Sequence, residues 1–279
     1  MSESTNYLIH GYKYDSGLGD LFRSIFNYYI YCKKNDINFN YNFFNNKLKY
    51  CIISNDEPPE NYIELEDNRT YFNENTKNVF KMYLKYNIMI YSTIGSIENV
   101  DYDDYLNYRH SFLNFIKFSD DIITRFTLEP KSYSVIHIRT GDKFIKNGHI
   151  KTDVRISNFD VSKLLSCINF LNNIENKIEH KTIILLTDNY ELRTIFNNIK
   201  NNNKNLYVPD TKICHCADHN ITKEEMLDIV YEFYIILNSK RVVSFSNSGF
   251  SKVSALIGSS DYYIYDNDNF IKKDFIIFD

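Results

Sequence analysis

The sequence predicts an α/β protein built from two halves, and three observations support this. Short apolar runs that end in glycine or polar residues alternate with stretches whose apolar residues recur at helical spacing. The alternation stops at Glu129-Pro130-Lys131 and then begins again, as expected where a proline favours a turn between domains. A chain of 279 residues is long enough for two modest cores. We therefore expect one domain at residues 1–129 and another at residues 130–279.

The first half begins with a strand at residues 7–12, which leads to Gly17-Leu18-Gly19-Asp20 and an amphipathic helix at residues 21–34. Glycines at this place let backbone N–H groups approach an anion at a helix N-terminus. The third glycine of a dinucleotide-binding fingerprint is absent, so an ordinary tight turn explains the same residues. The other elements expected in this half are strands at residues 36–44, 49–54 and 87–92 and helices at residues 74–86, 103–116 and 120–126.

The second half repeats the alternation more clearly. Asp160 and the capping box formed by Thr222 and Glu225 mark the starts of two helices, because such side chains accept from the free N–H groups of a first turn. The elements expected are strands at residues 133–138, 182–186 and 241–245 and helices at residues 160–171, 191–200, 222–238 and 252–257. Each of these strands ends in a polar or glycine-bearing turn, which is typical of a nucleotide-binding domain.

The composition argues against nucleic acid as a partner and against a membrane span. The formal net charge is −4, which leaves no basic footprint for nucleic acid. No apolar run approaches the ~18 residues that a span requires, and the first residues lack the features of a signal peptide. We expect a soluble, cytoplasmic protein. Its five cysteines are odd in number and lack the spacing of a disulfide framework, so we expect them to be reduced.

The clearest candidate site follows the strand at residues 133–138. The apolar strand gives way to Arg139, Gly141, Asp142 and Lys143. In open α/β sheets, ligands bind outside the carboxyl ends of the strands, and a guanidinium placed there can hold a diphosphate or a carboxylate through two parallel hydrogen bonds. A structural ion pair between Arg139 and Asp142 explains the same residues, and these residues alone leave both interpretations open.

The chain contains four motifs of interest: the Gly17-to-Asp20 turn, the His137-to-Lys143 stretch, Asp228 with the turn at residues 246–251, and Thr187-Asp188-Asn189. Together they resemble the fucosyltransferase superfamily, which includes the α-1,2-, α-1,6- and protein O-fucosyltransferases. The Gly17-to-Asp20 turn is similar to the family's N-terminal glycine loop, and His137-Ile-Arg139-Thr-Gly-Asp142-Lys143 resembles its His-x-Arg-x-x-Asp motif. The third motif joins Asp228, on a helix, to the serine-rich turn at residues 246–251. In the fourth, Thr187-Asp188-Asn189 stands where relatives carry a Ser/Thr-Asp-Asp turn.

This resemblance implies a GT-B fold, in which two Rossmann-like domains face each other across a cleft. It implies an inverting glycosyltransferase that moves fucose from GDP-fucose to a glycan or protein hydroxyl. The nucleotide-sugar donor would be held mainly by the C-terminal half, and no metal and no cofactor would be required. The acceptor, a glycan or glycoprotein, would contact the N-terminal half.

Carried over to this chain, the resemblance places Arg139 at the donor β-phosphate and His137 and Asp228 near the nucleoside. A carboxylate such as that of Asp228 suits guanine because it can accept from the ring N1–H and the exocyclic amine together. Charge on the leaving group would be met by Arg139 and a helix N-terminus in place of a divalent ion. The other donor-site residues expected are Gly17, Gly19, Asp142, Lys143, Asp188, Ser246, Asn247, Ser248, Gly249, Phe250 and Ser251.

The chain departs from the family at two points. Thr140 replaces the second arginine of the α-1,2 and α-1,6 relatives, which leaves a different nucleotide-sugar donor as an alternative. Residues 144–149 contain no acid, so the carboxylate that follows the motif in some relatives is missing. Asp20 is the candidate general base, and a helix N-cap role explains it equally. A catalytically silent nucleotide- or glycan-binding module is therefore a second alternative.

Two further clusters are expected to have no metal. Cys214, His215 and Cys216, with His219 close behind, are adjacent side chains that cannot all point at one ion without a contorted backbone. The acids of residues 101–104 are typical of a solvated helix start, where the helix dipole favours negative charge.

Overall fold

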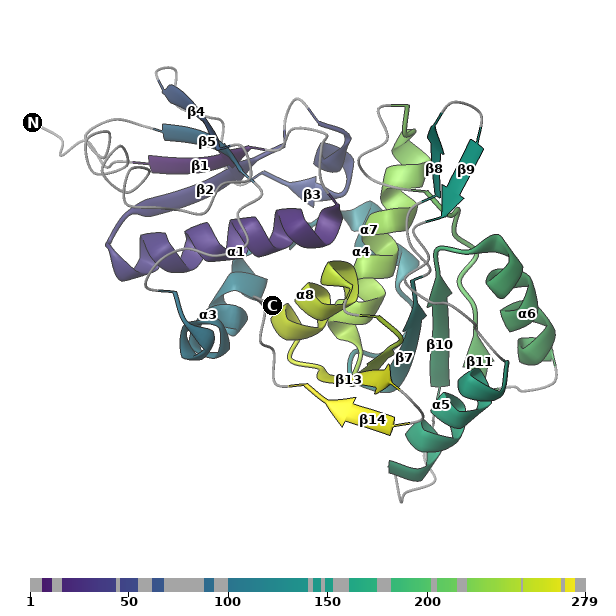
Figure 1. Ribbon diagram of the computed structural model, residues 1–279. Helices are drawn as coiled ribbons and strands as arrows, with labels where there is room; N and C mark the ends of the chain where they lie inside the picture. Colours follow the sequence, from purple (N-terminus) through teal and green to yellow (C-terminus); the bar gives the residue numbers. More distant parts are fainter. Residues whose placement is uncertain are drawn as a thin grey trace, which may run out of the picture. The chain divides into compact units, whose positions relative to one another are not determined.

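The computed structural model describes residues 7–11, 17–43, 46–54, 62–67, 88–92, 100–139, 143–146, 149–152, 161–174, 182–201, 205–214, 220–246, 248–266 and 269–273. The chain divides into two compact units (Figure 1). Unit 1 comprises Met1–Thr124, Cys216–Leu227 and Ile276–Asp279, and unit 2 comprises Arg125–His215 and Asp228–Phe275. Each unit contains its own sheet, parallel in unit 1 and mainly parallel in unit 2, with helices, so the predicted α/β class is confirmed. The domain boundary expected after residue 129 stays a prediction.

Unit 2 has the strand order of a dinucleotide-binding fold. Its sheet runs β11-β10-β7-β12-β13-β14, in which only β14 is antiparallel to its neighbour. Counted along the chain, this is the order 3-2-1-4-5-6 of the Rossmann fold, whose ligands bind where the strand order reverses. The bounds are β7 (Tyr133–Ile138), α5 (Val161–Ile174), β10 (Thr182–Thr187), α6 (Tyr190–Asn201), β11 (Leu206–Tyr207), α7 (Lys223–Asn238), β12 (Arg241–Ser244), α8 (Gly249–Ile257), β13 (Asp261–Asp266) and β14 (Asn269–Lys272). The reversal falls between β7 and β12.

Alternate residues of β7 face different layers, because successive side chains of a strand point to opposite faces. Ile136 and Ile138 belong to the core that α5 and α6 cover, together with Leu164 of α5 and Phe196 of α6. On the opposite face, the hydroxyl of Tyr133 donates to the carbonyl of Ile235 of α7 at 2.6 Å. Every residue of β7 is buried, which explains its near-continuous apolar sequence.

The end of α8 packs closely on the end of α7. Gly258 is the C-cap of α8. A β-carbon added to this residue would stand only 1.8 Å from the carbonyl oxygen of Leu237. The amino group of Lys131 donates to the carbonyls of Leu237, Ser239 (2.7 Å) and Gly258. One cation therefore joins carbonyls at the C-terminal ends of both helices, where the helix dipole favours positive charge.

Unit 1 contains a four-stranded parallel sheet with the order β2-β1-β5-β4. Its longest helix, α1, is buried along most of its length, and Phe26 of α1 stacks on Phe112 of α3 with ring centroids 4.4 Å apart. The bounds are β1 (Tyr7–Gly11), α1 (Leu18–Lys34), β2 (Asn38–Asn42), η1 (Lys47–Tyr50), β3 (Ile52–Ile53), β4 (Ile63–Asp67), β5 (Ile88–Ser92), α3 (Tyr102–Phe115), β6 (Lys117–Phe118) and α4 (Asp120–Arg125).

Several predictions of local structure in unit 1 can be compared directly with the fold. The acids at residues 101–104 form a capping box at the start of α3, as expected of a helix start. The strand expected at residues 49–54 is wrong in large part: η1 occupies Lys47–Tyr50, because the Asn46 side chain accepts from the Leu48 N–H at 2.8 Å and caps a 3₁₀ turn. The helix expected at residues 74–86 lies outside the described residues.

The remaining elements include a short hairpin, formed by β8 (Lys143–Lys146) and β9 (His149–Thr152), which sequence analysis missed. In α7, Thr222 and Glu225 form the expected capping box, with Glu225 accepting from the Thr222 N–H at 2.8 Å.

Of the helices that the described ranges contain, none combines the length and apolarity needed to cross a bilayer.

Candidate active site

The candidate site lies at the carboxyl ends of β7 and β12, where the strand order reverses. The register places Ser244 of β12 opposite His137 of β7, and the N–H of Phe245 donates to the His137 carbonyl at 3.3 Å. The two predicted motifs, one around Arg139 and one in the serine-rich turn, are therefore brought to neighbouring strand ends. This is the place where an open α/β sheet of this order binds its ligand.

Arg139 is held at this edge by Asp188. Thr187 pairs with Ile138 in the β10–β7 register, so the residues that follow them, Asp188 and Arg139, leave the sheet side by side. The Arg139 Nε lies 3.8 Å from the Asp188 Oδ2, and the side chains are 17% and 27% exposed. Such a partly buried pair orients the guanidinium at the end of the strand. Asp142, its other predicted partner, lies outside the described residues.

His137 is buried on the α7 and α8 side of the sheet. Its ring centroid is 5.7 Å from that of Phe250 of α8. Burial, together with the nearby Arg139 cation, lowers the pKa of His137 to about 3, so the imidazole is neutral at physiological pH. Among the residues that the structure describes, its Nδ1 has no hydrogen-bond partner. Because a buried polar atom is normally paired, a partner for this nitrogen would come from a bound molecule or from residues outside the described ranges.

The neutral, buried imidazole predicts acid sensitivity. The unfolded chain takes up a proton near pH 6.5 whereas folded His137 does not, so this residue's share of stability is present above that pH and is lost as the pH falls. Between pH 7.5 and 5 the loss should be about 2 kcal/mol. Urea unfolding of parent and His137→Asn should show a smaller pH dependence in the variant. His110→Asn, at an exposed position of α3, is the control; equal slopes for all three proteins would contradict the prediction.

The serine hydroxyls of the turn after β12 fall into two groups, those that make hydrogen bonds within the turn and those for which the described residues supply no partner. The Ser244 hydroxyl donates to the Ser246 carbonyl at 2.7 Å, and Ser251 lies 3.3 Å from the hydroxyl of Tyr262. These two serines shape the turn, so the predicted ligand contact of the Ser251 side chain stays a prediction. The buried hydroxyls of Ser246 and Ser248 have no partner within the described part of the chain. Asn247 lies outside it.

The N-terminus of α8 begins at the same turn. Ser248 is its N-cap, yet its side chain makes no capping hydrogen bond. The first N–H groups of a helix lack intrahelical partners and carry partial positive charge, and here they belong to Gly249, Phe250 and Ser251. Two buried hydroxyls that have no partner among the described residues thus lie beside a helix N-terminus, and groups of this kind can bind an oxyanion.

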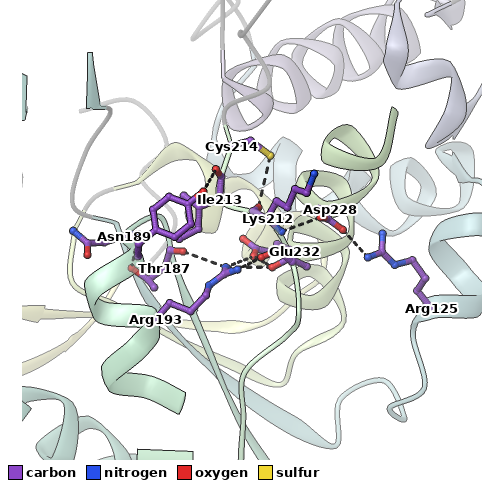
Figure 2. A network of polar contacts seen from close by, with 11 residues as sticks. Arg125, Thr187, Asn189, Arg193, Lys212, Ile213, Cys214, Asp228 and Glu232 are labelled. Atoms are coloured by element: carbon purple, nitrogen blue, oxygen red, sulfur yellow. Dashed lines mark hydrogen bonds and ion pairs between the residues drawn. The ribbon is translucent and has the colours of Figure 1, made fainter. Parts of the chain in front are cut away.

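Asp228 is already engaged by two groups of unit 2. Its Oδ1 lies 2.6 Å from the Arg125 Nη2, and its Oδ2 accepts from the Lys212 N–H at 2.9 Å. Figure 2 shows this carboxylate between Arg125 and the segment at residues 208–214, which follows β11. Its predicted contact with guanine therefore stays a prediction, and any such contact would use the remaining lone pairs of the two oxygens.

A second acid of α7 belongs to a network that sequence analysis missed. Glu232 lies one turn beyond Asp228 and contacts Arg193 of α6 and Thr211 of the 208–214 segment. Burial raises the pKa of Glu232, and the Thr211 hydroxyl and Arg193 oppose that rise. The available signal was an acid within the otherwise apolar and aromatic stretch of α7 after Asp228, because an acid placed there must find a partner.

The predicted residues of unit 1 surround the start of α1. Gly17 is the N-cap and Gly19 is buried in the first turn. The N-cap alternative for Asp20 is wrong, since the helix begins at Leu18, one turn earlier than expected, and places Asp20 inside its first turn. The Asp20 carboxylate lies 2.9 Å from the Arg23 Nη2 and its side chain is 45% exposed. Its role as general base stays a prediction.

Lys143, another predicted donor-site residue, begins β8. Its contact with the donor stays a prediction.

The last candidates concern metals. Within the ranges that the structure describes, no three His, Cys, Asp or Glu side chains are placed to hold an ion. Cys214 is described, and its thiol lies 3.6 Å from the Lys212 carbonyl, whereas His215, Cys216 and His219 fall outside those ranges. The expectation of no metal at these residues stays a prediction.

Comparisons with known proteins place this fold. No protein-family model and no curated protein matches the sequence, but solved structures match. The α-1,6-fucosyltransferase NodZ co-crystallised with GDP is 10% identical, with a TM-score of 0.54 over 97% of this chain and 99% of that one; NodZ comes from Bradyrhizobium. A mutant of FUT1 of Arabidopsis thaliana in complex with GDP is 11% identical, with a TM-score of 0.58 over 96% of this chain and 73% of that one. POFUT1 in complex with GDP is 10% identical, with a TM-score of 0.55 over 95% of this chain and 99% of that one.

The chain therefore has an α/β fold like that of the GT-B fucosyltransferases. The resemblance that the sequence motifs indicated is confirmed at the level of the fold.

Proposed function

We propose that this protein is a glycosyltransferase that moves fucose from GDP-fucose to a hydroxyl of a glycan or glycoprotein. One observation carries the proposal. At the point where the strand order reverses, the guanidinium of Arg139, the N-terminus of α8 and the buried hydroxyls of Ser246 and Ser248, which have no partner among the described residues, lie at neighbouring strand ends. These are groups that bind phosphate oxygens, and structures of similar fold are described as co-crystallised with GDP, soaked with GDP-fucose or in complex with GDP.

The same groups suit the chemistry of sugar transfer. As the bond between the sugar and the β-phosphate breaks, negative charge grows on the departing GDP. A preorganised guanidinium and a helix N-terminus stabilise that charge without having to reorient. The hydroxyls of Ser246 and Ser248, which lack partners among the described residues, would gain them from phosphate oxygens, and this removes the penalty of burying a hydroxyl without a hydrogen bond. The proposal includes inversion at the anomeric carbon and no need for a metal ion.

Nucleotide binding is the most direct test. GDP and GDP-fucose are expected to raise the melting temperature clearly more than UDP or ADP, since ligand at a hundred times its dissociation constant stabilises the native state by about 2.7 kcal/mol. Thermal shift with the four nucleotides at matched concentration measures this. Equal shifts from GDP, UDP and ADP would overturn the choice of guanine.

Turnover separates an enzyme from a binding module. Slow release of free fucose from GDP-fucose in the absence of acceptor supports the transferase. Tight binding of GDP, with no fucose released under any acceptor tried, would instead establish a silent nucleotide-binding protein.

Metal independence has its own test. Because Arg139 and the α8 N-terminus are proposed to neutralise the diphosphate, EDTA is expected to leave turnover within about twofold of the untreated protein, far from the several kcal/mol that removing a catalytic metal would cost. If EDTA abolished turnover and Mg²⁺ or Mn²⁺ restored it, Asp188 would have to be reinterpreted as a metal ligand.

A further inference from the structure

The segment at residues 208–214 follows the carboxyl end of β11, on the same side of the sheet as the carboxyl ends of β7 and β12 that form the candidate site. It lacks helix and strand, yet its backbone is tied to its surroundings at three consecutive residues. The Arg193 guanidinium donates to the Thr211 carbonyl, Asp228 accepts from the Lys212 N–H at 2.9 Å, and the Tyr190 hydroxyl donates to the Ile213 carbonyl at 3.3 Å (Figure 2). These three contacts hold an irregular segment in place, which is what a ligand-binding wall requires.

Arg193 is the residue that joins this segment to the candidate site. Its Nη2 lies 3.1 Å from the Glu232 Oε1 and 3.2 Å from the Thr211 Oγ1. The same nitrogen lies 3.5 Å from the carbonyl of Thr187, the last residue of β10. The next residue along the chain is Asp188, the partner of Arg139. One guanidinium thus contacts both the turn that carries Asp188 and the segment after β11.

The chemistry of this network argues for a role beyond stability. A buried ion pair often stabilises a fold no better than apolar side chains of equal volume, because both charges lose their hydration. Arg193 and Glu232 are 14% and 16% exposed. The contribution of this ion pair is geometric. A planar guanidinium with several fixed donors sets the positions of Thr187, Thr211 and Glu232 together.

We infer that Arg193 is a positioning residue for donor binding, which fixes the 208–214 segment and the Asp188 turn as the wall and the support of a nucleoside diphosphate site. This inference rests on the proposed function. Arg193 acts through Thr211 and Thr187, and Glu232 orients Arg193. Loss of this support should shift the site by a fraction of an ångström, and displacements of that size are known to lower binding and turnover strongly.

The experiment compares Arg193→Met with a matched variant at the amino ends of the strands, away from the candidate site. Arg241 is the first residue of β12, is 13% exposed, and lies 3.7 Å from Asp261. Arg241→Met therefore also removes an ion pair of the same sheet, but at the other end of the strands. Thr211→Val, which keeps the side-chain shape and deletes only the hydroxyl, covers the case in which Arg193→Met does not fold. Hydrogen exchange of the ligand-free proteins and calorimetric titration with GDP are measured on all of them.

Arg193→Met is expected to exchange faster at residues 208–214 and to bind GDP at least about tenfold more weakly. Thr211→Val should show the same effects at smaller size. Arg241→Met should melt earlier than the parent yet keep its GDP affinity. An unchanged GDP affinity in folded Arg193→Met and Thr211→Val, or an equal loss in Arg241→Met, would overturn the inference alone. A parent protein that binds neither GDP nor any other nucleoside diphosphate would overturn the proposed function and, with it, the role given to Arg193.

Discussion

An Arg139→Lys variant is expected to lose about 10²–10³ in turnover rate, nearly as much as Arg139→Ala. Loss of one preorganised contact to developing charge typically costs this much, roughly 3–4 kcal/mol. Lysine should fail because its ammonium supplies the charge without the planar fork that matches two phosphate oxygens. The measurements are turnover of GDP-fucose and melting temperature on the same preparation.

The contrasting possibility is that Arg139 serves only Asp188, 3.8 Å away, as an ion pair between strand ends. Either substitution would then lower stability while the folded fraction kept near-normal turnover. Arg241→Lys is the control, because Arg241 is similarly buried in another ion pair of the same sheet. A stable Arg139→Lys protein with turnover within about threefold of the parent, far short of the loss expected for a transition-state contact, would end the claim that Arg139 carries the chemistry.

Gly258→Ala should destabilise unit 2 by about 3 kcal/mol or more, at the upper end of the range for overpacking. The added methyl group would stand 1.8 Å from the Leu237 carbonyl oxygen. That oxygen belongs to the backbone, so no side-chain rotation relieves the clash and the ends of α7 and α8 must separate. Their separation would also disturb the hydrogen bonds from Lys131 to both. Urea unfolding followed by circular dichroism measures the loss.

Ser259→Gly is the control for this position. Ser259 adopts φ 60°, a left-handed conformation in which glycine is unstrained. Its stability should therefore stay within about 1 kcal/mol of the parent, since relief of strain offsets the greater freedom of the unfolded chain. A Gly258→Ala protein as stable as the Ser259→Gly protein would show that the two helix ends can move apart freely.

The sequence predicted those elements of the fold that have strong local signals. β7 was predicted to its exact bounds because every one of its positions is buried and apolar residues dominate it. α7 was predicted from its capping box. Strands such as β11 and β6 were missed since each is only two residues long, and so short a run has no period to detect. β14 was missed as well; its residues are mostly exposed at the sheet edge.

The candidate site was predictable only in part, for a related reason. Arg139 and the serine-rich turn stand out because each combines polar residues with the end of an apolar strand. Which residues they meet depends on register: the Asp188 partner of Arg139 is set by the pairing of β10 with β7. The contact between Arg193 and Glu232 joins residues 39 positions apart on two helices. No pattern within either helix encodes such a contact, because it arises from packing of the whole unit.

The place of β7 in its sheet also determines when the candidate site can be completed during synthesis. β7 pairs with β10, from which residues 139–181 separate it, and with β12, from which residues 139–240 separate it. Closing the longer connection costs more chain entropy than closing the shorter one, although by less than about 1 kcal/mol. A ribosome adds residues from the N-terminus, so Arg139 is made well before Ser248 and the start of α8. A nascent chain that ends before β12 carries the arginine at a sheet edge but has neither the two hydroxyls nor the helix N-terminus. The anion cradle is therefore acquired in a single late step, when the strand carrying the serines docks beside a strand made a hundred residues earlier.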